Sequence, residues 1–275
     1  MRDMKSIPLE DSFGDIVGKA VRGLKISKEE LAARSGVEAG VVSALLEGEF
    51  DEAASRKVAP HLGLSADALI ESGRKTWRPE AVTVDGLAQF NTPYEDMTVN
   101  SYLAWDTETH EAVAFDTGAD AGEMLDLIKI KGLRLVAILL THTHGDHIFD
   151  LDRLKSRTGA PAYVGNREPI EGAETFQEGR TFTCGKLKIE TRLTWGHSEG
   201  GITYVVRGLD RSLAVVGDAV FAGSMGGGIV SFDDALRTNR AAILTLEDET
   251  VICPGHGPLT TVGEEKKHNP FLAER

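Results

Sequence analysis

The sequence predicts an α+β protein in which a small all-α region precedes a mixed β-sheet core with helices outside it. From Asp15 to about Gly73, short amphipathic patterns are punctuated by glycine and show almost no β-branched alternation. From Ala81 onward, short β-type runs alternate with helical patterns and outnumber them. The segment 76–80, which contains Pro79, breaks the helical pattern. We therefore expect a helical domain at 1–75, a linker at 76–80 and a second domain at 81–275.

The helical region is expected to contain short helices with recognisable ends. Ser27 and Glu30 form a capping-box pattern, in which the serine oxygen accepts from the backbone of Glu30 and the carboxylate accepts from the backbone of Ser27. Gly36 and Gly48 follow two of the patterns, as expected at helix ends. The expected helices span residues 28–34, 38–48, 55–62 and 66–72.

The second region is expected to hold a mixed sheet. The candidate strands span residues 82–90, 99–105, 112–116, 133–140, 161–164, 187–193, 202–206, 212–216 and 250–253. The candidate helices span residues 121–131, 148–157 and 233–246. Because the strands occur in both meandering and crossover contexts, a mixed sheet is expected rather than a purely parallel one.

Composition and charge exclude several classes of protein. The 275 residues are 41% hydrophobic and 27% charged, which is ordinary for a globular protein. There are 30 basic and 43 acidic residues, and the resulting charge of −13 disfavours binding to nucleic acid or to an anionic membrane. No apolar stretch is long enough to span a bilayer, and the charged first ten residues do not resemble a signal peptide. With only Cys184 and Cys253, far apart, no disulfide framework is expected and a cytoplasmic location is predicted.

A histidine cluster follows the apolar strand at 133–140. The chain continues as Thr-His-Thr-His-Gly-Asp-His, and residues two apart in an extended segment point the same way. His142 and His144 can therefore converge on one cation. Gly145 permits a tight turn that would direct Asp146 and His147 towards a second position nearby. Imidazole nitrogen and carboxylate oxygen are ligands of Zn²⁺ and similar metals, so the pattern predicts a metal site.

Three further segments place a candidate ligand where a strand ends or in a glycine-rich loop beside one. They carry His197, Asp218 and His256. Each segment is a weak signal alone, but the arrangement of a strand end followed by a ligand recurs four times in one region. Sites in layered sheet proteins form at strand ends, and together the segments therefore predict one shared site.

This combination resembles the metallo-β-lactamase superfamily, from about Val82 to the C-terminus. The family's HxHxDH signature is intact, and the later ligand positions match in order and context. The resemblance implies a four-layered αββα sandwich with two divalent metal ions at one edge, zinc first, with iron and manganese as alternatives. It implies that His142, His144 and His197 bind the first metal. Asp146, His147 and His256 would bind the second, and Asp218 would bridge both.

Within the superfamily, the segments around Asp218 and after His256 look like those of the glyoxalase II-like hydrolases. That branch implies attack of a metal-bridging hydroxide on the carbonyl of a small thioester, ester or lactone, with Asp146 and Asp218 as catalytic residues. Glutathione itself is not assigned as part of the substrate. Only 19 residues follow His256, so the C-terminal helical domain of full-length glyoxalase II is not expected. The segment Gly223–Val230 also lacks the Arg and Asp common in the family.

The helical region resembles a lambda-repressor-like helix-turn-helix over residues 30–48. Its expected recognition element, 38–44, contains no Lys, Arg, Asn or Gln, the side chains that read base edges or phosphates. Residues 1–75 hold 11 basic and 13 acidic residues, so DNA binding is not favoured. An apolar run (Val41, Val42, Leu45, Leu46), expected to be exposed, instead suggests packing or a homodimer formed through this domain.

Two alternatives to the hydrolase remain open at this point. The first is a mononuclear iron enzyme of the persulfide dioxygenase kind, which shares the HxHxDH frame. The second is a regulator whose metal domain senses a metabolite and controls the N-terminal DNA-binding module. A small-molecule substrate is expected for either enzyme, and no membrane partner is expected for any of the three.

Overall fold

Two six-stranded sheets face each other in the computed structural model, which describes residues 7–273. The first sheet has the order β1 (Leu87–Tyr94), β2 (Met97–Trp105), β3 (Glu111–Phe115), β4 (Arg134–Leu139), β5 (Ala162–Gly165) and β6 (Glu174–Phe176). The second has the order β12 (Thr260–Thr261), β11 (Val251–Pro254), β10 (Leu213–Gly217), β9 (Ile202–Arg207), β8 (Leu187–Leu193) and β7 (Thr181–Cys184). β3 to β6 run parallel, as do β10 and β11, while the other neighbours are antiparallel. The expected mixed sheet core is therefore confirmed, as two sheets.

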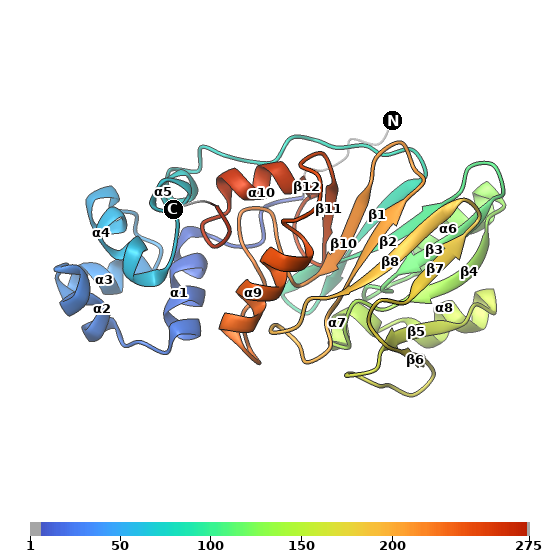
Figure 1. The fold of residues 1–275 in the computed structure, drawn as a ribbon, viewed down its shortest axis with the longest axis horizontal. Coiled ribbons are helices and arrows are strands. Elements are labelled where there is room, and N and C mark those ends of the chain that lie inside the picture. The colour runs from blue at the N-terminus through green and yellow to red at the C-terminus, as the bar shows by residue number, and fades with distance from the viewer. Residues whose placement is uncertain (1–6, 274–275) are drawn as a thin grey trace.

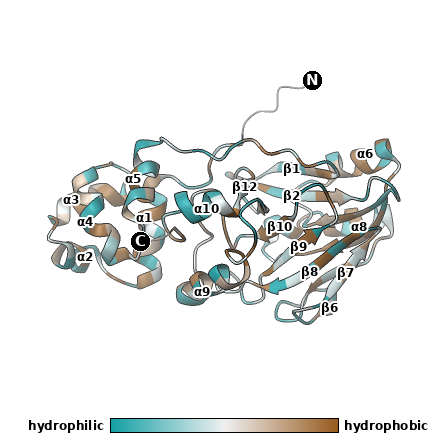
Figure 2. Ribbon diagram, turned by 45° about the horizontal axis from the view of Figure 1, so that its top comes forward, coloured by the Kyte–Doolittle hydropathy of each residue, from teal (hydrophilic) through white to brown (hydrophobic). Residues whose placement is uncertain are grey.

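Helices cover the outer faces of both sheets (Figure 1). On the first sheet, α6 (Gly122–Lys131) and α8 (Leu151–Thr158) bury Met124 and Leu154 against strand residues such as Ile138. On the second, α9 (Phe232–Ala242) and α10 (Val262–His268) bury apolar side chains against β9, β10 and β11. Between the sheets lies an apolar core that includes Phe115, Leu139, Tyr204 and Val215. Strands β9 and β10 are accordingly apolar and mostly brown in Figure 2. The layers are thus helix, sheet, sheet and helix.

Five helices precede the sheets in the described part of the chain: α1 (Phe13–Leu24), α2 (Lys28–Ser35), α3 (Ala39–Leu46), α4 (Glu52–Leu62) and α5 (Ala66–Arg74). Their apolar faces share one hydrophobic cluster with residues of α9 and β10. The backbone N–H of Ser65 also donates to the carbonyl of Pro270 at 2.8 Å. The helical region is therefore packed on the outer side of the second sheet, beside α9 and α10. Its likeness to a helix-turn-helix remains a prediction.

Two expectations for this helical region are wrong. Ser27 does accept from the backbone of Glu30, but the Glu30 carboxylate pairs with Arg34 one turn later and does not return to Ser27. The complete capping box lies at α1, between Ser12 and Asp15. The apolar run of α3 is not exposed: Val42 and Leu45 are fully buried among the helices, and Val41 and Leu46 are partly buried against the same cluster.

Several element boundaries also differ from the expected ones. β1 begins at Leu87 and not at residue 82, and α8 begins at Leu151 because residue 148 ends a separate short helix, α7 (Gly145–Ile148). β6, β7, β12 and α10 were not expected; the three strands have two to four residues each, too few to show a period. No helix among the described residues is long and apolar enough to cross a membrane.

Candidate metal centre

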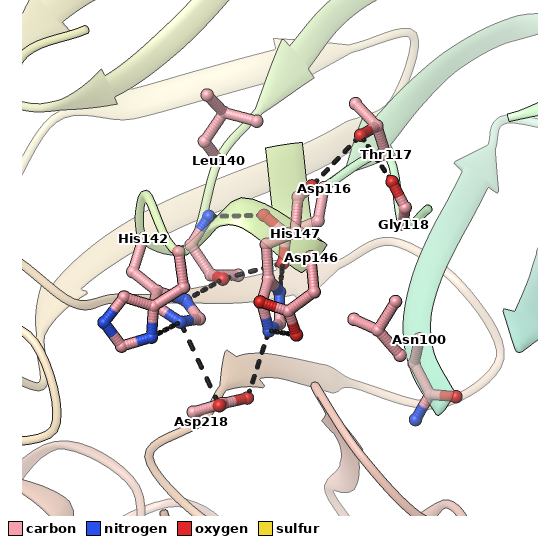
Figure 3. Close-up of polar contacts among 12 residues, drawn as sticks. Asn100, Asp116, Thr117, Gly118, Leu140, His142, Asp146, His147 and Asp218 are labelled. Atoms are coloured by element: carbon pink, nitrogen blue, oxygen red, sulfur yellow. Dashed lines mark hydrogen bonds and ion pairs between the residues drawn. The ribbon is translucent and has the colours of Figure 1, made fainter. Parts of the chain in front are cut away.

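All seven candidate ligands meet at one edge of the two sheets (Figure 3 labels four of them). His142, His144, Asp146 and His147 follow β4, and the last two lie on α7. His197 lies in the loop between β8 and β9, while Asp218 and His256 follow the parallel strands β10 and β11. The carboxyl ends of neighbouring parallel strands meet at one edge, which explains why Asp218 and His256 are close although they are 38 positions apart in the sequence.

The first group consists of His142, His144, His197 and Asp218. Nδ1 of His144 lies 3.1 Å from Nε2 of His142 and 3.1 Å from Nε2 of His197. Oδ2 of Asp218 lies 3.3 Å from Nε2 of His197 and 4.0 Å from Nε2 of His142. Three nitrogens and one oxygen therefore converge on one point, which is a donor set that a tetrahedral metal ion accepts.

The second group consists of Asp146, His147 and His256. Oδ2 of Asp146 lies 3.6 Å from Nε2 of His147 and 3.4 Å from Nε2 of His256. Asp218 touches this group as well, because its Oδ1 is 3.2 Å from Nε2 of His147 and its Oδ2 is 3.4 Å from Nε2 of His256. One carboxylate thus lies between two clusters of donors.

Two atoms of this cluster are buried without a hydrogen-bond partner among the described residues. They are Nε2 of His147 and Oδ1 of Asp218, which lie 3.2 Å apart but without the geometry of a hydrogen bond. A buried polar atom without a partner costs free energy, and such atoms call for an explanation. A cation is a partner that both an imidazole nitrogen and a carboxylate oxygen accept, so the donor chemistry fits a metal ion at this position.

The charged groups of the cluster shift one another's pKa values. Burial would raise the pKa of Asp218, but His256 and His147 lower it to well below its usual value. Burial would lower the pKa of His147, but the carboxylates of Asp218 and Asp116 raise it to about 10. His256, also buried, has a pKa raised to about 11, mainly by Asp218. By contrast, burial together with His147 keeps the pKa of His142 well below its usual value. Carboxylates therefore raise the pKa of both histidines of the second group, whereas burial lowers the pKa of His142 and His197 in the first group.

The ring nitrogens that face away from the cluster are held by the rest of the fold. Nδ1 of His147 lies 2.8 Å from Oδ2 of Asp116. Nδ1 of His256 lies 2.7 Å from the carbonyl of Thr98, and Nδ1 of His197 lies 2.9 Å from the carbonyl of Gly227. A carbonyl or carboxylate at Nδ1 places the proton there and leaves the lone pair of Nε2 for a metal, as is usual in metal sites.

Asp116 is a residue whose role the sequence reasoning missed (Figure 3). It ends the expected strand 112–116 and adopts a left-handed conformation with φ of 55°. Besides His147, its carboxylate accepts from the backbone and the hydroxyl of Thr141, both at 2.7 Å. It therefore ties the histidine segment to β3. The same signal that marked Asp218, an acidic residue directly after a buried strand, could have identified it.

Asn100 and Glu168 were also missed, and both hold ligand segments in place. The Asn100 side chain donates to the carbonyls of Pro254 and Gly257, on either side of His256 (2.9 and 2.8 Å). Glu168 accepts from the backbone N–H of Thr143 at 3.1 Å and from that of Gly200 at 2.9 Å. Glu168 thus joins the segment of His142 and His144 to the loop of His197. No local pattern marks either residue.

Glycine is required at two positions beside Asp218. A Cβ atom on Gly255 would lie 2.1 Å from Oδ1 of Asp218, and one on Gly226 would lie 2.0 Å from the carbonyl of Asp218. Real Cβ atoms do not approach other atoms so closely. The glycines around Asp218 therefore allow the backbone to close around the cluster.

Comparison with known proteins also indicates a metal-binding hydrolase fold family. The sequence model of the metallo-beta-lactamase superfamily matches residues 94–256, a range that contains all seven candidate ligands. A probable metallo-hydrolase, YqgX of Bacillus subtilis, is 31% identical over 66% of this chain and 95% of its own length. Hydroxyacylglutathione hydrolase GloC of Haemophilus influenzae is 29% identical over 63% of this chain and 92% of its own. The bovine mitochondrial persulfide dioxygenase ETHE1 is 28% identical over 82% of this chain and 84% of its own.

Solved structures show the same fold. The BLEG-1 B3 metallo-beta-lactamase superposes with a TM-score of 0.59 at 28% identity, over 68% of this chain and all of that one. TTHA1623, solved in a di-iron-bound form, superposes with a TM-score of 0.54 at 27% identity, over 66% of this chain and all of that one. From the family match, the shared fold and the converging histidines and aspartates, we conclude that the chain belongs to the metallo-beta-lactamase superfamily.

Proposed function

We propose that this protein is a dinuclear metal-dependent hydrolase that cleaves a small thioester, ester or lactone. The observation that carries the proposal is the position of Asp218 between two groups of donors, with its Oδ1 and the Nε2 of His147 both lacking a hydrogen-bond partner among the described residues. In this proposal His142, His144 and His197 hold one divalent cation. Asp146, His147 and His256 hold the other, and Asp218 contacts both.

Divalent cations in such a site supply water with a lowered pKa and polarise a carbonyl oxygen. The side chains supply position and charge. Asp218 and Asp146 are kept ionised at neutral pH because histidines face them and lower the pKa of each carboxyl. Asp146 is the more exposed of the two, with 13% of its side chain accessible against 8% for Asp218. It is therefore the better placed to orient water or to accept its proton.

The substrate class rests on two kinds of support. Neither cysteine lies in a ligand motif, and both are buried, which raises the pKa of each thiol. A relative over most of its own length is named as a hydroxyacylglutathione hydrolase, which acts on a thioester. Zinc is proposed as the first metal, and the di-iron form of TTHA1623 keeps iron as the alternative.

Purification with metal analysis, followed by a panel of thioesters, lactones and persulfides, tests the proposal. Two metal ions per chain and turnover of a thioester or lactone are expected for the natural protein. His142→Ala should abolish turnover, whereas His61→Ala, an exposed histidine of the helical region, should leave it unchanged. Full turnover in both His142→Ala and Asp218→Ala would overturn the proposal.

A second candidate is a mononuclear iron enzyme that oxidises a persulfide. It is favoured by one observation, the match to a persulfide dioxygenase over 82% of this chain. One iron per chain and oxygen consumption with a persulfide would favour this candidate. Two metals per chain and hydrolysis without oxygen would favour the hydrolase.

For the helical region, we propose packing and substrate binding in place of DNA recognition. α3 carries no Lys, Arg, Asn or Gln, and its Val42 and Leu45 are committed to the core. A homodimer through this region remains part of the proposal, and sedimentation of the purified protein tests it. A mobility shift of DNA by the protein at low salt would contradict this proposal and support DNA binding.

A further inference from the structure

The loop between β10 and α9 is tied to the helical region by a buried ion pair. The pair consists of Lys19, on α1, and Asp11, in the segment before it, with only 14% and 8% of their side chains exposed. Nζ of Lys19 donates to the carbonyl of Met225 at 2.8 Å, and Oδ2 of Asp11 accepts from the hydroxyl of Ser224 at 2.5 Å. Both members of the pair lie outside residues 94–256, the part of the chain that matches the superfamily.

Two candidate ligands depend on this loop for their position. Asp218 is its first residue, and the N–H of Gly226 donates to the carbonyl of Asp218 at 3.1 Å. The carbonyl of Gly227 lies 2.9 Å from Nδ1 of His197. Met225, which accepts from the buried lysine, directly precedes both glycines. The ion pair therefore fixes the backbone next to the two groups that contact these ligands.

A third ligand, His256, is reached through an aromatic ring of the same loop. The ring of Phe221 packs edge-on against that of His256, with centroids 5.5 Å apart and an interplanar angle of 81°. Nζ of Lys19 lies over the ring of Phe221, 5.0 Å from its centroid, where a cation is attracted to an aromatic face. Within residues 7–273, no hydrogen bond or ion pair joins Lys19 or Asp11 to the histidine segment after β4.

The ion pair is not needed to attach the helical region. Apolar side chains of the helices already share one cluster with α9 and β10. Burying a lysine and an aspartate carries a desolvation penalty, so a buried ion pair is weak evidence for stability. Hydrogen bonds to a backbone carbonyl and a hydroxyl, however, fix direction and favour one arrangement of the loop. Control of the loop's position therefore explains the pair better than attachment does.

We propose that Lys19 and Asp11 are positioning residues of the metal centre. Through them the helical region holds His197, Asp218 and His256 in place. The proposal rests on the dinuclear site of the proposed function. Because one of these ligands belongs to each donor group and Asp218 contacts both, loss of the ion pair should weaken the binding of both metal ions.

Zinc titration of the double variant Asp11→Asn/Lys19→Met tests the proposal. Removing both charges avoids leaving a buried charge without a partner. The dissociation constants of both zinc ions should rise about tenfold, at the low end of the range for partners outside the ligand set. Val58→Ala is the matched control, because it opens a cavity among the helices and lowers stability while both contacts to the loop remain. Its zinc affinity should be unchanged.

NMR signals of the imidazole N–H groups in the zinc-loaded protein separate positioning from general loosening. In the double variant, the Nδ1–H signals of His197 and His256 should shift. That of His147, which faces Asp116, should not. Ser224→Ala removes one of the two hydrogen bonds to the loop and should shift the same signals by less. This milder variant carries the test if the double variant does not fold.

Unchanged zinc affinity in the folded variants overturns the proposal. A loss of the same size in Val58→Ala, or an equal shift of the His147 signal, also overturns it, because the effect would then be general loosening. Weaker zinc binding in a protein that cleaves no thioester, ester or lactone supports the positioning role and contradicts the hydrolase. A natural protein that binds no divalent metal contradicts both.

Discussion

Asp218 and Glu265 are buried carboxyl groups at the loop between β10 and α9, and they are in opposite electrostatic situations. Asp218 begins the loop and lies within 3.4 Å of His147, His197 and His256. Glu265 lies on α10, and it accepts from the N–H of Gly223 in the loop at 3.0 Å, from Asn269 at 2.7 Å and from Thr260 at 2.8 Å. All three of these partners are neutral.

The two pKa values diverge accordingly. Histidines hold the pKa of Asp218 well below its usual value, although burial alone would raise it. Burial raises the pKa of Glu265 to about 8, and its hydrogen bonds only partly offset that rise. Burial alone therefore does not decide the charge of a carboxyl group; the charge of its partners does. Asp218 is arranged as a charged ligand, and Glu265 as a neutral hydrogen-bonding brace.

The largest effect is expected from Asp218→Asn, which keeps the shape and removes the charge. Loss of the carboxylate that faces both donor groups should lower kcat about a thousandfold and reduce the bound metal below two ions per chain. Steady-state kinetics with metal analysis checks this, and a thermal melt controls for folding. Activity within tenfold of the natural protein would show that Asp218 is not the shared ligand.

Asp116→Asn is expected to have an intermediate effect. Asp116 contacts His147 through Nδ1 and belongs to neither donor group, so the change should act through the orientation and basicity of that imidazole. Losses of about 10- to 100-fold in metal affinity or activity are typical for such outer partners. Metal titration should show one ion weakened much more than the other, whereas equal weakening of both would contradict the grouping of His147 with the second metal.

Gly226→Ala tests the close packing of this loop against the backbone of Asp218. The new Cβ atom would lie 2.0 Å from the carbonyl of Asp218, so the backbone must shift at a cost of roughly 2 kcal/mol in the free energy of unfolding. At Gly227, by contrast, the nearest atom to a new Cβ is Cγ1 of Ile229 at 3.7 Å, and Gly227→Ala is the matched control. Denaturant unfolding of both variants measures the difference; equal stability would show that the loop adapts freely.

The smallest effect on activity is expected from Glu265→Gln, which instead changes the pH dependence of stability. Because the folded-state pKa of Glu265 is raised from 4.5 to about 8, its contribution to stability is present below pH 4.5 and is lost as the pH rises through 8. Between about pH 5 and 9 the variant should therefore lose less unfolding free energy than the natural protein, by on the order of 3 kcal/mol. Parallel pH profiles of the two proteins would contradict the raised pKa.

The sequence predicts the parts of the fold that repeat a local pattern. The strand expected at 187–193 coincides with β8, and the helix expected at 28–34 ends one residue short of α2. The strands of β6 and β12 escape prediction because three and two residues, respectively, are too few to show alternation. Whether an apolar side chain is buried within its own region or exposed for a partner is likewise not local, as Val42 shows.

The candidate metal site likewise has residues that the sequence indicates and residues that it does not. His142, His144, Asp146 and His147 lie within six consecutive positions, so the spacing of these residues alone indicates a metal site. Asp116 reaches His147 across 31 positions and Asn100 reaches the carbonyl of Gly257 across 157, and these contacts exist only once the sheets have formed.

Anomalous diffraction from crystals of the metal-loaded protein, recorded at the absorption edge of the bound metal, is the decisive test of a dinuclear centre. We predict two peaks, one contacted by His142, His144 and His197 and the other by Asp146, His147 and His256, with Asp218 at both. A single peak away from Asp218, or no ordered metal at this edge of the sheets, would contradict the dinuclear site.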